Sequence, residues 1–360
     1  METSHPKAVR LWLIVCAALI AVMVCVGGAT RLTDSGLSIT QWDLLMGALP
    51  PMSHADWEEA FALYRQIPEY ERVNAGMTLA EFEGIYWWEW GHRNLGRIIG
   101  LVFLLPLAWF SVRGTVRGTL LLKLWGLLAL VCLQGAIGWY MVASGLSERV
   151  DVSQYRLALH LGTALVLFCL VVWQVLALGH PRGEHAAAGL GGWGAAGLAL
   201  AFGQVTLGAF VAGLRAGLSY NTWPLMDGRF VPAGYFGDPA RASDLFERVA
   251  AVQFNHRIGA YLLLAFAAAF AWRTWRAGAA RYGVVPLAAV SGQALLGIWT
   301  LLAAVPLPLG VAHQAGALAV LSSFVWAVYA LTPARSPAGS ARSRASAPRG
   351  RPVHPAPPSA

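Results

Sequence analysis

A carboxylate and an imidazole stand three residues apart where a long polar segment of the sequence meets an apolar one. They are Glu89 and His92, and this spacing places both on one face of a helix. A carboxylate can accept a proton or position a substrate, and an imidazole can move protons or bind a metal ion. A second His-Arg pair like His92-Arg93 occurs in the other half of the chain, at His256-Arg257. The sequence thus offers two comparable histidine positions and one acid beside the first of them.

The elements that carry these residues are long and apolar. Of the 360 residues, 57% are hydrophobic and 12% are charged, which excludes a soluble enzyme. Runs of about 20 apolar residues can cross a hydrocarbon layer of about 30 Å, and a backbone in lipid forms helices because its polar groups need internal partners. The sequence predicts an all-α integral membrane protein with eight transmembrane helices, at 11–29, 93–112, 119–143, 155–178, 190–214, 249–272, 282–303 and 308–331.

The basic residues predict how these helices are oriented. With the N-terminus in the cytoplasm, the inner segments hold more than half of the 26 Lys and Arg residues but, of the acids, only Glu2 and Glu184. This is the positive-inside pattern of a multi-pass membrane protein. It explains the net charge of +8 without a nucleic-acid partner. We expect a cell inner membrane protein with both termini in the cytoplasm.

The two halves of the chain repeat. Gly-Leu-Ser follows the first helix at 36–38 and the fifth at 217–219. With four helices in each half, both halves have the same orientation, so we expect two tandem four-helix bundles related by a pseudo-twofold axis along the membrane normal. The expected parts are a cytoplasmic N-terminus (1–10), an N-terminal half (11–178) with a long outer loop (30–92), a cytoplasmic linker (179–189), a C-terminal half (190–331) and a disordered cytoplasmic tail (332–360).

Four histidines lie at similar depth in the even-numbered helices, two in each half. His92 opens its helix, and at 1.5 Å per residue the others lie about 8 to 10 Å from the outer helix ends. Ionisable residues in membrane helices are costly and usually functional, although any single one could be a neutral imidazole bonded to a neighbouring helix. Imidazoles that face each other across a four-helix bundle can hold a haem iron from both sides. We therefore predict two haem sites near the periplasmic side, His92 with His160 and His256 with His313.

Arginines and glycines accompany these histidines. Arg93 and Arg257 could pair with haem propionates, or they could extend to lipid headgroups, and the sequence leaves both roles open. Nearby glycines would make room for a flat macrocycle, although small residues also serve plain helix packing; they are Gly96, Gly100, Gly162, Gly259 and Gly316.

The two halves differ in one titratable group. Three residues before His256 stands Gln253, which cannot take up a proton, whereas Glu89 holds that place in the first half. A carboxylate beside a haem could accept protons or position a substrate. The difference predicts that the N-terminal haem is transformed and that the C-terminal haem is a fixed redox cofactor. The alternative is that Glu89 lies at the outer surface and pairs with Arg93 or Arg97.

The most distinctive stretches of the sequence resemble one family of membrane enzymes, the haem A synthases, which oxidise haem O to haem A for cytochrome oxidase. They are GATRLTDSGLS at 28–38 with Trp42 and Pro50-Pro51, EWGHR at 89–93, VAGLRAG at 211–217 with NTWPLMD at 221–227, and NHR at 255–257. The resemblance covers roughly residues 10–330. Some members carry cysteine pairs in the outer loops; this sequence has none and looks closer to the proteobacterial and mitochondrial branch.

The resemblance implies roles for the residues already named. It implies a cofactor haem b held by residues matching His256 and His313, substrate haem O at residues matching His92 and His160, and a carboxylate at Glu89 needed for turnover. The reaction would convert a porphyrin methyl to a formyl group through successive hydroxylations and loss of water. Haem O synthase, a farnesyltransferase, would supply the substrate, and the product would enter cytochrome oxidase assembly. The electron donor and a homo-oligomeric state stay open.

Other classes of function fit the sequence less well. A di-haem b-type electron-transfer cytochrome would place its haems on opposite sides of the membrane, whereas all four histidines lie on one side. A transporter with parallel repeats would more plausibly place polar groups at the midplane, and the first, third, fifth and seventh helices offer little beyond Gln134, Gln204 and Gln293. The His-Glu-x-x-His pattern of zinc proteases is absent, and no second Glu-x-x-His completes a di-iron site.

Overall fold

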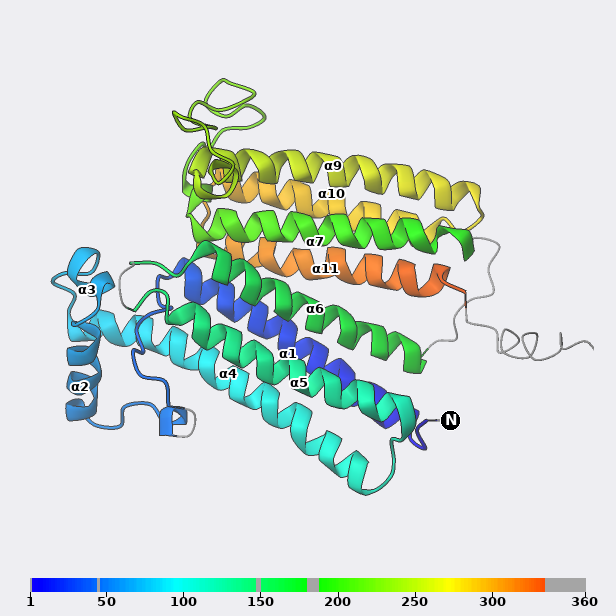
Figure 1. Ribbon diagram of the computed structural model, residues 1–360, viewed down its shortest axis with the longest axis horizontal. Coiled ribbons are helices and arrows are strands. Elements are labelled where there is room, and N and C mark those ends of the chain that lie inside the picture. Colours follow the sequence, from blue (N-terminus) through cyan, green and yellow to red (C-terminus); the bar gives the residue numbers. More distant parts are fainter. Residues whose placement is uncertain (1, 44–45, 147–149, 180–187, 334–360) are drawn as a thin grey trace, which may run out of the picture.

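A computed structural model describes residues 2–43, 46–146, 150–179 and 188–333, and within these ranges the ordered elements are helices (Figure 1). Eight of them are long and apolar enough to cross a membrane, so the predicted eight-helix, multi-pass fold is confirmed. The expected linker and tail fall almost entirely outside the described residues. The eight helices are α1 (Pro6–Leu32), α4 (Leu79–Val112), α5 (Gly118–Val142), α6 (Gln154–Gly179), α7 (Gly191–Gly213), α9 (Val249–Arg276), α10 (Arg281–Leu302) and α11 (Leu307–Leu331).

The eight helices pack as two closed rings of four. In the first ring α1 and α5 each contact α4 and α6, and in the second α7 and α10 each contact α9 and α11. The helices that carry the histidines, α4 with α6 and α9 with α11, therefore stand diagonally opposite each other. The rings meet where α1 and α6 contact α11 and where α6 contacts α7 (Figure 1). A twofold axis between the rings would generate this set of contacts. The contacts do not give the angle that relates one ring to the other, so the pseudo-twofold relation stays a prediction.

The two ends of the bundle differ. At one end the N-terminal residues pair with the α4–α5 turn: Ser4 N donates to Thr115 O at 3.1 Å and Arg117 N donates to Glu2 O at 2.9 Å. We call this the terminal end. The opposite end, the loop end, carries the long segments 33–78 and 214–248, with the short helices α2 (His54–Tyr64), α3 (Pro68–Arg72) and α8 (Asp244–Glu247) (Figure 1).

Helix α4 begins earlier than the apolar pattern indicates, within the segment expected to be loop. Thr78 caps the helix: its side chain accepts from Glu81 N at 3.3 Å, and its own backbone N–H donates to the Glu81 carboxylate at 2.8 Å. The added turns carry Phe82, whose ring stacks on Phe61 of α2 with centroids 4.9 Å apart. The extension of α4 and α2 thus share a small aromatic core beyond the membrane-spanning bundle.

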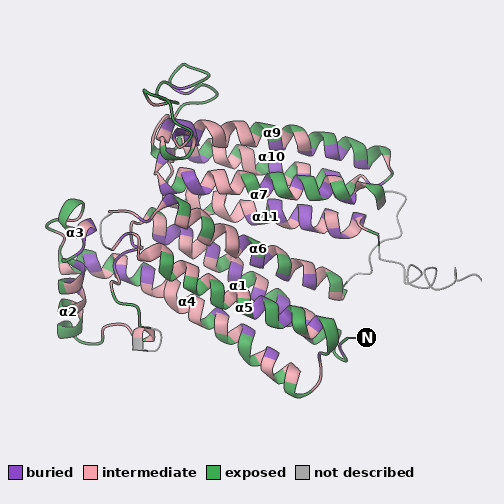
Figure 2. Ribbon diagram, in the orientation of Figure 1, coloured by how far each residue is buried: buried purple, intermediate pink, exposed green. Residues whose placement is uncertain are grey.

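Exposed residues run along the helices of both rings (Figure 2), and many of them are large and apolar. Leu105 of α4 is 62% exposed, Leu122 of α5 is 74% exposed and Leu295 of α10 is 68% exposed. An apolar surface of this extent would be unfavourable in water and suits the hydrocarbon of a bilayer. The core that the helices bury between them holds residues such as Phe103, Phe270 and Phe324, so packing contacts fix the helix positions that any site depends on.

Candidate functional site

The two histidines of the C-terminal ring face each other across it. His256 of α9 and His313 of α11 have ring centroids 6.4 Å apart and ring planes at 82°. Imidazoles that bind one metal ion from opposite sides, with metal–nitrogen bonds of about 2 Å, have ring centres about 6 Å apart. The observed spacing therefore suits a single iron between the two rings.

The two histidines of the N-terminal ring hold the corresponding places. His92 lies on α4 and His160 on α6, the diagonal pair of that ring, and both side chains are half-buried. His160 is six residues from the start of α6, as His313 is in α11, and His256 is seven from the start of α9, about 9 to 10 Å along each helix from the loop end. His92 is farther from the start of α4 because that helix extends beyond the bundle.

Each histidine ring packs against a glycine of the preceding membrane helix. A Cβ atom added at Gly27 would lie 2.9 Å from Cε1 of His92, and one at Gly138 would lie 2.9 Å from Cε1 of His160. The corresponding distances are 3.1 Å for Gly208 and His256 and 2.7 Å for Gly297 and His313. Such distances are shorter than ordinary carbon–carbon contacts, so a side chain at any of these glycines would displace the ring.

Glutamines one turn before three of those glycines hold the histidines in place. Each glutamine contacts one histidine: Gln134 contacts His160, Gln204 contacts His256 and Gln293 contacts His313. In each pair Nε2 of the glutamine donates to the backbone oxygen of the histidine, at 2.8, 2.9 and 2.7 Å respectively. The same Nε2 lies 3.0, 3.0 and 3.1 Å from Nδ1 of the histidine ring. The sequence shows Gln-x-x-x-Gly at 134–138 and 293–297 as one of the repeats between the two halves, but it does not indicate that the glutamines contact the histidines. The signal for that role is a third copy at 204–208, which places Gln-x-x-x-Gly each time on the helix before a histidine.

The glutamine contacts set the hydrogen bonding of the histidine rings. A histidine that binds metal through one ring nitrogen donates the N–H of the other to an acceptor, which fixes the ring and strengthens the ligand. Here the amide nitrogen, a donor, approaches Nδ1, and the amide oxygen of each of the three glutamines is buried and has no hydrogen-bond partner among the described residues. The glutamines therefore position the rings but, in this arrangement, offer Nδ1 a donor rather than the acceptor of a metal-bound histidine.

The glycines that the sequence suggested for a macrocycle have different surroundings. A Cβ on Gly259 or Gly316 would collide with the amide oxygen of Gln204 or Gln293, so these glycines admit the glutamines. A Cβ on Gly100 would meet nothing within 4 Å, and Cβ atoms on Gly96 and Gly162 would meet a first atom only at 3.5 and 3.8 Å.

Glu89 is buried and fully engaged. Its side chain is 3% exposed. One oxygen accepts from Nε and Nη2 of Arg93 at 3.1 and 2.7 Å, and the other accepts from Ser38 Oγ and Ile39 N, both at 2.8 Å. Arg93 also donates to the backbone oxygens of Ile39 at 2.7 Å and Gln41 at 2.9 Å. Glu89 does pair with Arg93, but the pair is buried beneath the loop that follows α1 rather than lying at the surface.

The C-terminal half repeats this arrangement with an amide in place of the carboxylate. Arg257 donates to the backbone oxygens of Tyr220 at 2.7 Å and Thr222 at 2.8 Å, and to Oε1 of Gln253 at 2.9 Å. Gln253 in turn donates to Ala216 O at 2.7 Å. Both arginines are thus occupied by the chain itself, each holding the loop after the first helix of its ring against the histidine helix.

Four charged side chains join the two rings at the loop end. Nη2 of Arg215 lies 2.7 Å from Asp34 and 3.1 Å from Asp151. Arg31 lies 3.1 Å from Asp34 and 3.4 Å from Asp151. Asp34 follows α1 and Arg215 follows α7, and both adopt the left-handed backbone conformation, with φ of 52° and 51°. The ion pairs therefore connect matching positions of the two halves.

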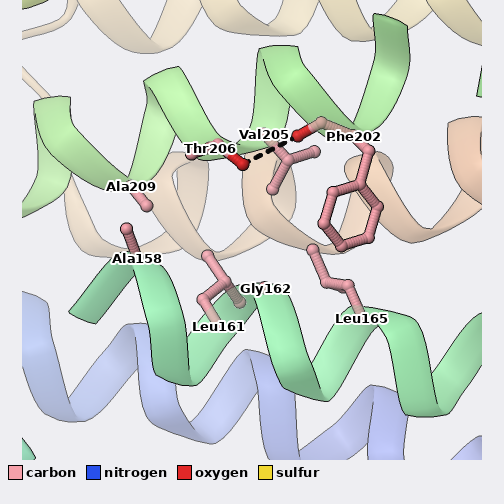
Figure 3. A pocket seen from close by; sticks show the side chains of 8 residues that line it. All are labelled: Ala158, Leu161, Gly162, Leu165, Phe202, Val205, Thr206 and Ala209. Atoms are coloured by element: carbon pink, nitrogen blue, oxygen red, sulfur yellow. Dashed lines mark hydrogen bonds between the residues drawn. The ribbon is translucent and has the colours of Figure 1, made fainter. Parts of the chain in front are cut away.

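Two small hollows lie near the histidines, and neither is of haem size. The first, with about 160 Å³ of empty space, is lined mainly by apolar side chains and lies between α6 and α7, where the rings meet (Figure 3). Its walls include Gly162, two residues after His160, and Val205, which follows Gln204. The second, with about 230 Å³, lies between Arg93, the loop residues Thr40–Trp42 and the end of α5.

Comparison with known proteins identifies the family. The model of the cytochrome oxidase assembly protein family matches residues 10–325. The haem A synthase of Maricaulis maris is 51% identical over 331 residues, which is 91% of this chain and 97% of that protein. That of Parvibaculum lavamentivorans is 51% identical over 330 residues (92% and 96%), and that of Bradyrhizobium diazoefficiens is 54% identical over 326 residues (89% and 90%). The chain belongs to the haem A synthase family of cytochrome oxidase assembly proteins.

Proposed function

We propose that this protein is a haem A synthase, which oxidises the porphyrin methyl of haem O to the formyl group of haem A. The observation that carries this proposal is the identity of about half of all residues with haem A synthases along nearly the whole of both chains. The reaction places the protein in the pathway that assembles cytochrome oxidase.

The cofactor site of this proposal is the C-terminal ring, where His256 and His313 would hold haem b. The 6.4 Å spacing of the two rings supports it. So do Gln204 and Gln293, whose amides orient both imidazoles. A bound haem supplies one-electron redox chemistry at its iron. The chain would contribute the two ligands and hold their rings in place through Gln204 and Gln293.

The substrate site of this proposal is the N-terminal ring, where His92 and His160 would bind haem O. Glu89, one helical turn before His92, is the residue that can accept a proton there, and Gln253 at the matching position of the other ring cannot. Its present partners are Arg93 and the loop residues Ser38 and Ile39. Uptake of a proton by the Glu89 carboxylate would therefore change its hydrogen bonds to Ser38 and Ile39 of the loop that covers it. Arg93 and Arg257 are proposed contacts of the haem propionates.

The proposed location is a cell inner membrane, with the termini in the cytoplasm and the haem sites near the periplasmic side. Basic residues at the terminal end support this orientation by the positive-inside rule; they are Lys7, Arg10, Arg113, Arg117, Lys123, Arg273, Arg276 and Arg281. The proposed supplier of substrate is haem O synthase. The oxidation also requires an electron donor, and a homo-oligomer is compatible with the proposal.

The test is production of haem A in a membrane. The full chain is co-expressed with a haem O-producing enzyme in cells that make no haem A of their own, and extracted haems are separated by chromatography. Conversion of haem O to haem A is the expected result. Haem O that accumulates unchanged, while the purified protein carries haem in both rings, would favour the alternative of a di-haem b-type electron-transfer cytochrome.

A further inference from the structure

An irregular segment after α7 turns back along the side of the bundle. We call residues 219–236 the flank segment. Its Trp223 donates from Nε1 to the hydroxyl of Tyr261 at 3.0 Å, and the hydroxyl of its Tyr235 donates to the side-chain oxygen of Asn255 at 2.8 Å. Both partners lie on α9, and Figure 1 shows the loop after α7 standing out beside the first turns of that helix. The flank segment therefore lies against the helix rather than beyond its end.

The partners of the flank segment lie at membrane depth. Helix α9 has 28 residues and carries Arg273 and Arg276 in its last turn, where basic side chains meet the headgroups. A hydrocarbon layer of about 30 Å takes about 20 residues of helix, and counted back from Arg273 these reach Gln253. Asn255 and Tyr261 both follow Gln253 in the chain. The flank segment thus contacts α9 within the thickness of the bilayer.

The outward side of the flank segment is apolar. Phe230 is 67% exposed, Val231 is 50% exposed and Phe236 is 55% exposed. The segment has two charged residues, Asp227 and Arg229, and both stand in one tight turn. Such a group of exposed apolar side chains would be unfavourable in water, whereas the boundary between headgroups and acyl chains accepts apolar and charged side chains together.

Side chains of the protein pair with the backbone carbonyl oxygens of the flank segment. Donors from α9 and the residue before it bind four of these oxygens: Gln253 binds Ser219 O, Arg257 binds Tyr220 O and Thr222 O, and Arg248 binds Gly234 O. Hydroxyls within the segment bind two more, Tyr220 to Ala233 O at 3.3 Å and Thr222 to Leu225 O at 2.8 Å. A loop in water finds such partners in the solvent, whereas a loop among lipids needs them within the protein. The pairing favours lipid around the segment.

We propose that the flank segment is an interfacial membrane segment, seated in the leaflet at the loop end with its exposed apolar side chains among the acyl chains. Its contacts along α9, its apolar outward side and its paired carbonyl oxygens carry this inference together. The partner is a lipid surface, and the segment anchors the C-terminal ring at a fixed depth, as aromatic residues at the interface do for membrane helices. The inference follows from the membrane-spanning fold and does not depend on the proposed activity.

The test places a nitroxide label on the segment in a lipid bilayer. The four native cysteines of the full chain are replaced by alanine, and Phe230→Cys or Val231→Cys supplies the labelling site. The labelled protein is reconstituted into phosphatidylcholine nanodiscs, where oxygen concentrates among the acyl chains and a nickel chelate stays in the water. We expect power saturation in electron paramagnetic resonance to show more access for oxygen than for nickel at both positions. Both side chains are exposed, so their replacement removes little packing.

Ala240→Cys is the matched control on the same loop. Ala240 is exposed, and its neighbour Arg241 donates its backbone N–H to Asp244 of α8, ahead of the first turn of α9, at 2.9 Å. A label there should show more access for nickel than for oxygen. A second measurement keeps the native cysteines, all of which lie in membrane-spanning helices: a membrane-impermeant maleimide should modify Ala240→Cys and spare Val231→Cys.

The alternatives give different results. Access for nickel and maleimide at Val231 equal to that at Ala240 would show an aqueous loop and overturn the inference. Labels at Phe230 and Val231 that are shielded from oxygen and nickel alike would show that protein covers the segment, which would also overturn it. Spin–spin broadening between labels would then identify that protein as a second copy of the chain.

Discussion

Replacement of Glu89 by glutamine separates its chemical role from its structural one. The C-terminal ring provides the precedent, because Gln253 occupies the matching position and still holds Arg257 at 2.9 Å. Glu89→Gln keeps one oxygen for Arg93, whose guanidinium now lies 2.7 Å from the carboxylate. It removes the negative charge and the ability to take up a proton.

The structural cost of this change is limited. The variant weakens the two charge-assisted bonds from Arg93 and leaves the backbone N–H of Ile39, now 2.8 Å from the carboxylate, facing an amide nitrogen. Hydrogen bonds to charged groups contribute roughly 1.5 to 3 kcal/mol each, and the variant keeps a neutral acceptor for Arg93, so we expect the outer loop to lose roughly 2 to 4 kcal/mol while the helices and haem binding persist. Haem A production should fall roughly 100- to 10,000-fold, the usual contribution of a general acid or base.

The assay combines three measurements on purified membranes and protein. Chromatography of extracted haems gives the product, haem absorbance gives occupancy, and thermal unfolding gives stability. Ser38→Ala is the control, since it removes one hydrogen bond of 2.8 Å to the carboxylate and leaves the acid in place. Normal haem A levels in Glu89→Gln, or an equal loss of product in Ser38→Ala, would refute a proton-accepting role and leave Glu89 as a support for the loop.

Three further predictions concern the histidines of the C-terminal ring, the glycine that packs against one of them, and a buried acid outside the bundle. His256→Ala and His313→Ala should each abolish the absorbance of the resident haem, and full haem content in both variants would contradict the assignment. Gly208→Ala should lower haem occupancy of the C-terminal ring, because its Cβ would lie 3.1 Å from the histidine ring, whereas Gly203→Ala on the same helix meets nothing within 4 Å and should bind haem normally. Burial, and to a smaller extent nearby carboxylates, raise the pKa of Glu69 from its usual 4.5 to about 8. Between pH 4.5 and pH 8 the folded protein therefore keeps a proton on Glu69 that the unfolded chain has lost. Stability should therefore fall as the pH rises from 4.5 to 8, and Glu69→Gln should flatten that dependence in thermal unfolding; an unchanged slope would place the proton elsewhere.

The fold could be predicted from the sequence because its signals are local. Apolar runs indicate where the eight helices lie, and the repeated His-Arg pair indicates which positions of the two halves correspond. The early start of α4 depends on a short capping pattern, Thr78 with Glu81, that lies outside the apolar run from which the helix is predicted. Its amphipathic first turns are stabilised by the aromatic core that they share with α2, which only the folded chain brings together.

The site could be predicted only in part, because its partners come from distant segments. Histidines in membrane helices are conspicuous, whereas a glutamine such as Gln204 gains its meaning from a ring on another helix, 52 residues away. The burial of Glu89 likewise depends on Ser38 and Ile39, which fold back from the loop after α1. No pattern within either segment indicates that contact.

One pattern occurs four times along the chain: a helix with Gln-x-x-x-Gly or Met-x-x-x-Gly is followed by a membrane helix with a histidine. This repetition bears on how such a protein could arise. The pairs α1–α4, α5–α6, α7–α9 and α10–α11 are four versions of one helical hairpin, and two hairpins close each ring around one pair of histidines. Two copies of a single hairpin would therefore bring two identical histidines face to face, which is the arrangement proposed here for a haem site. Successive gene duplications then allow each copy to change separately, so that one hairpin can give up its glutamine while the other three keep theirs.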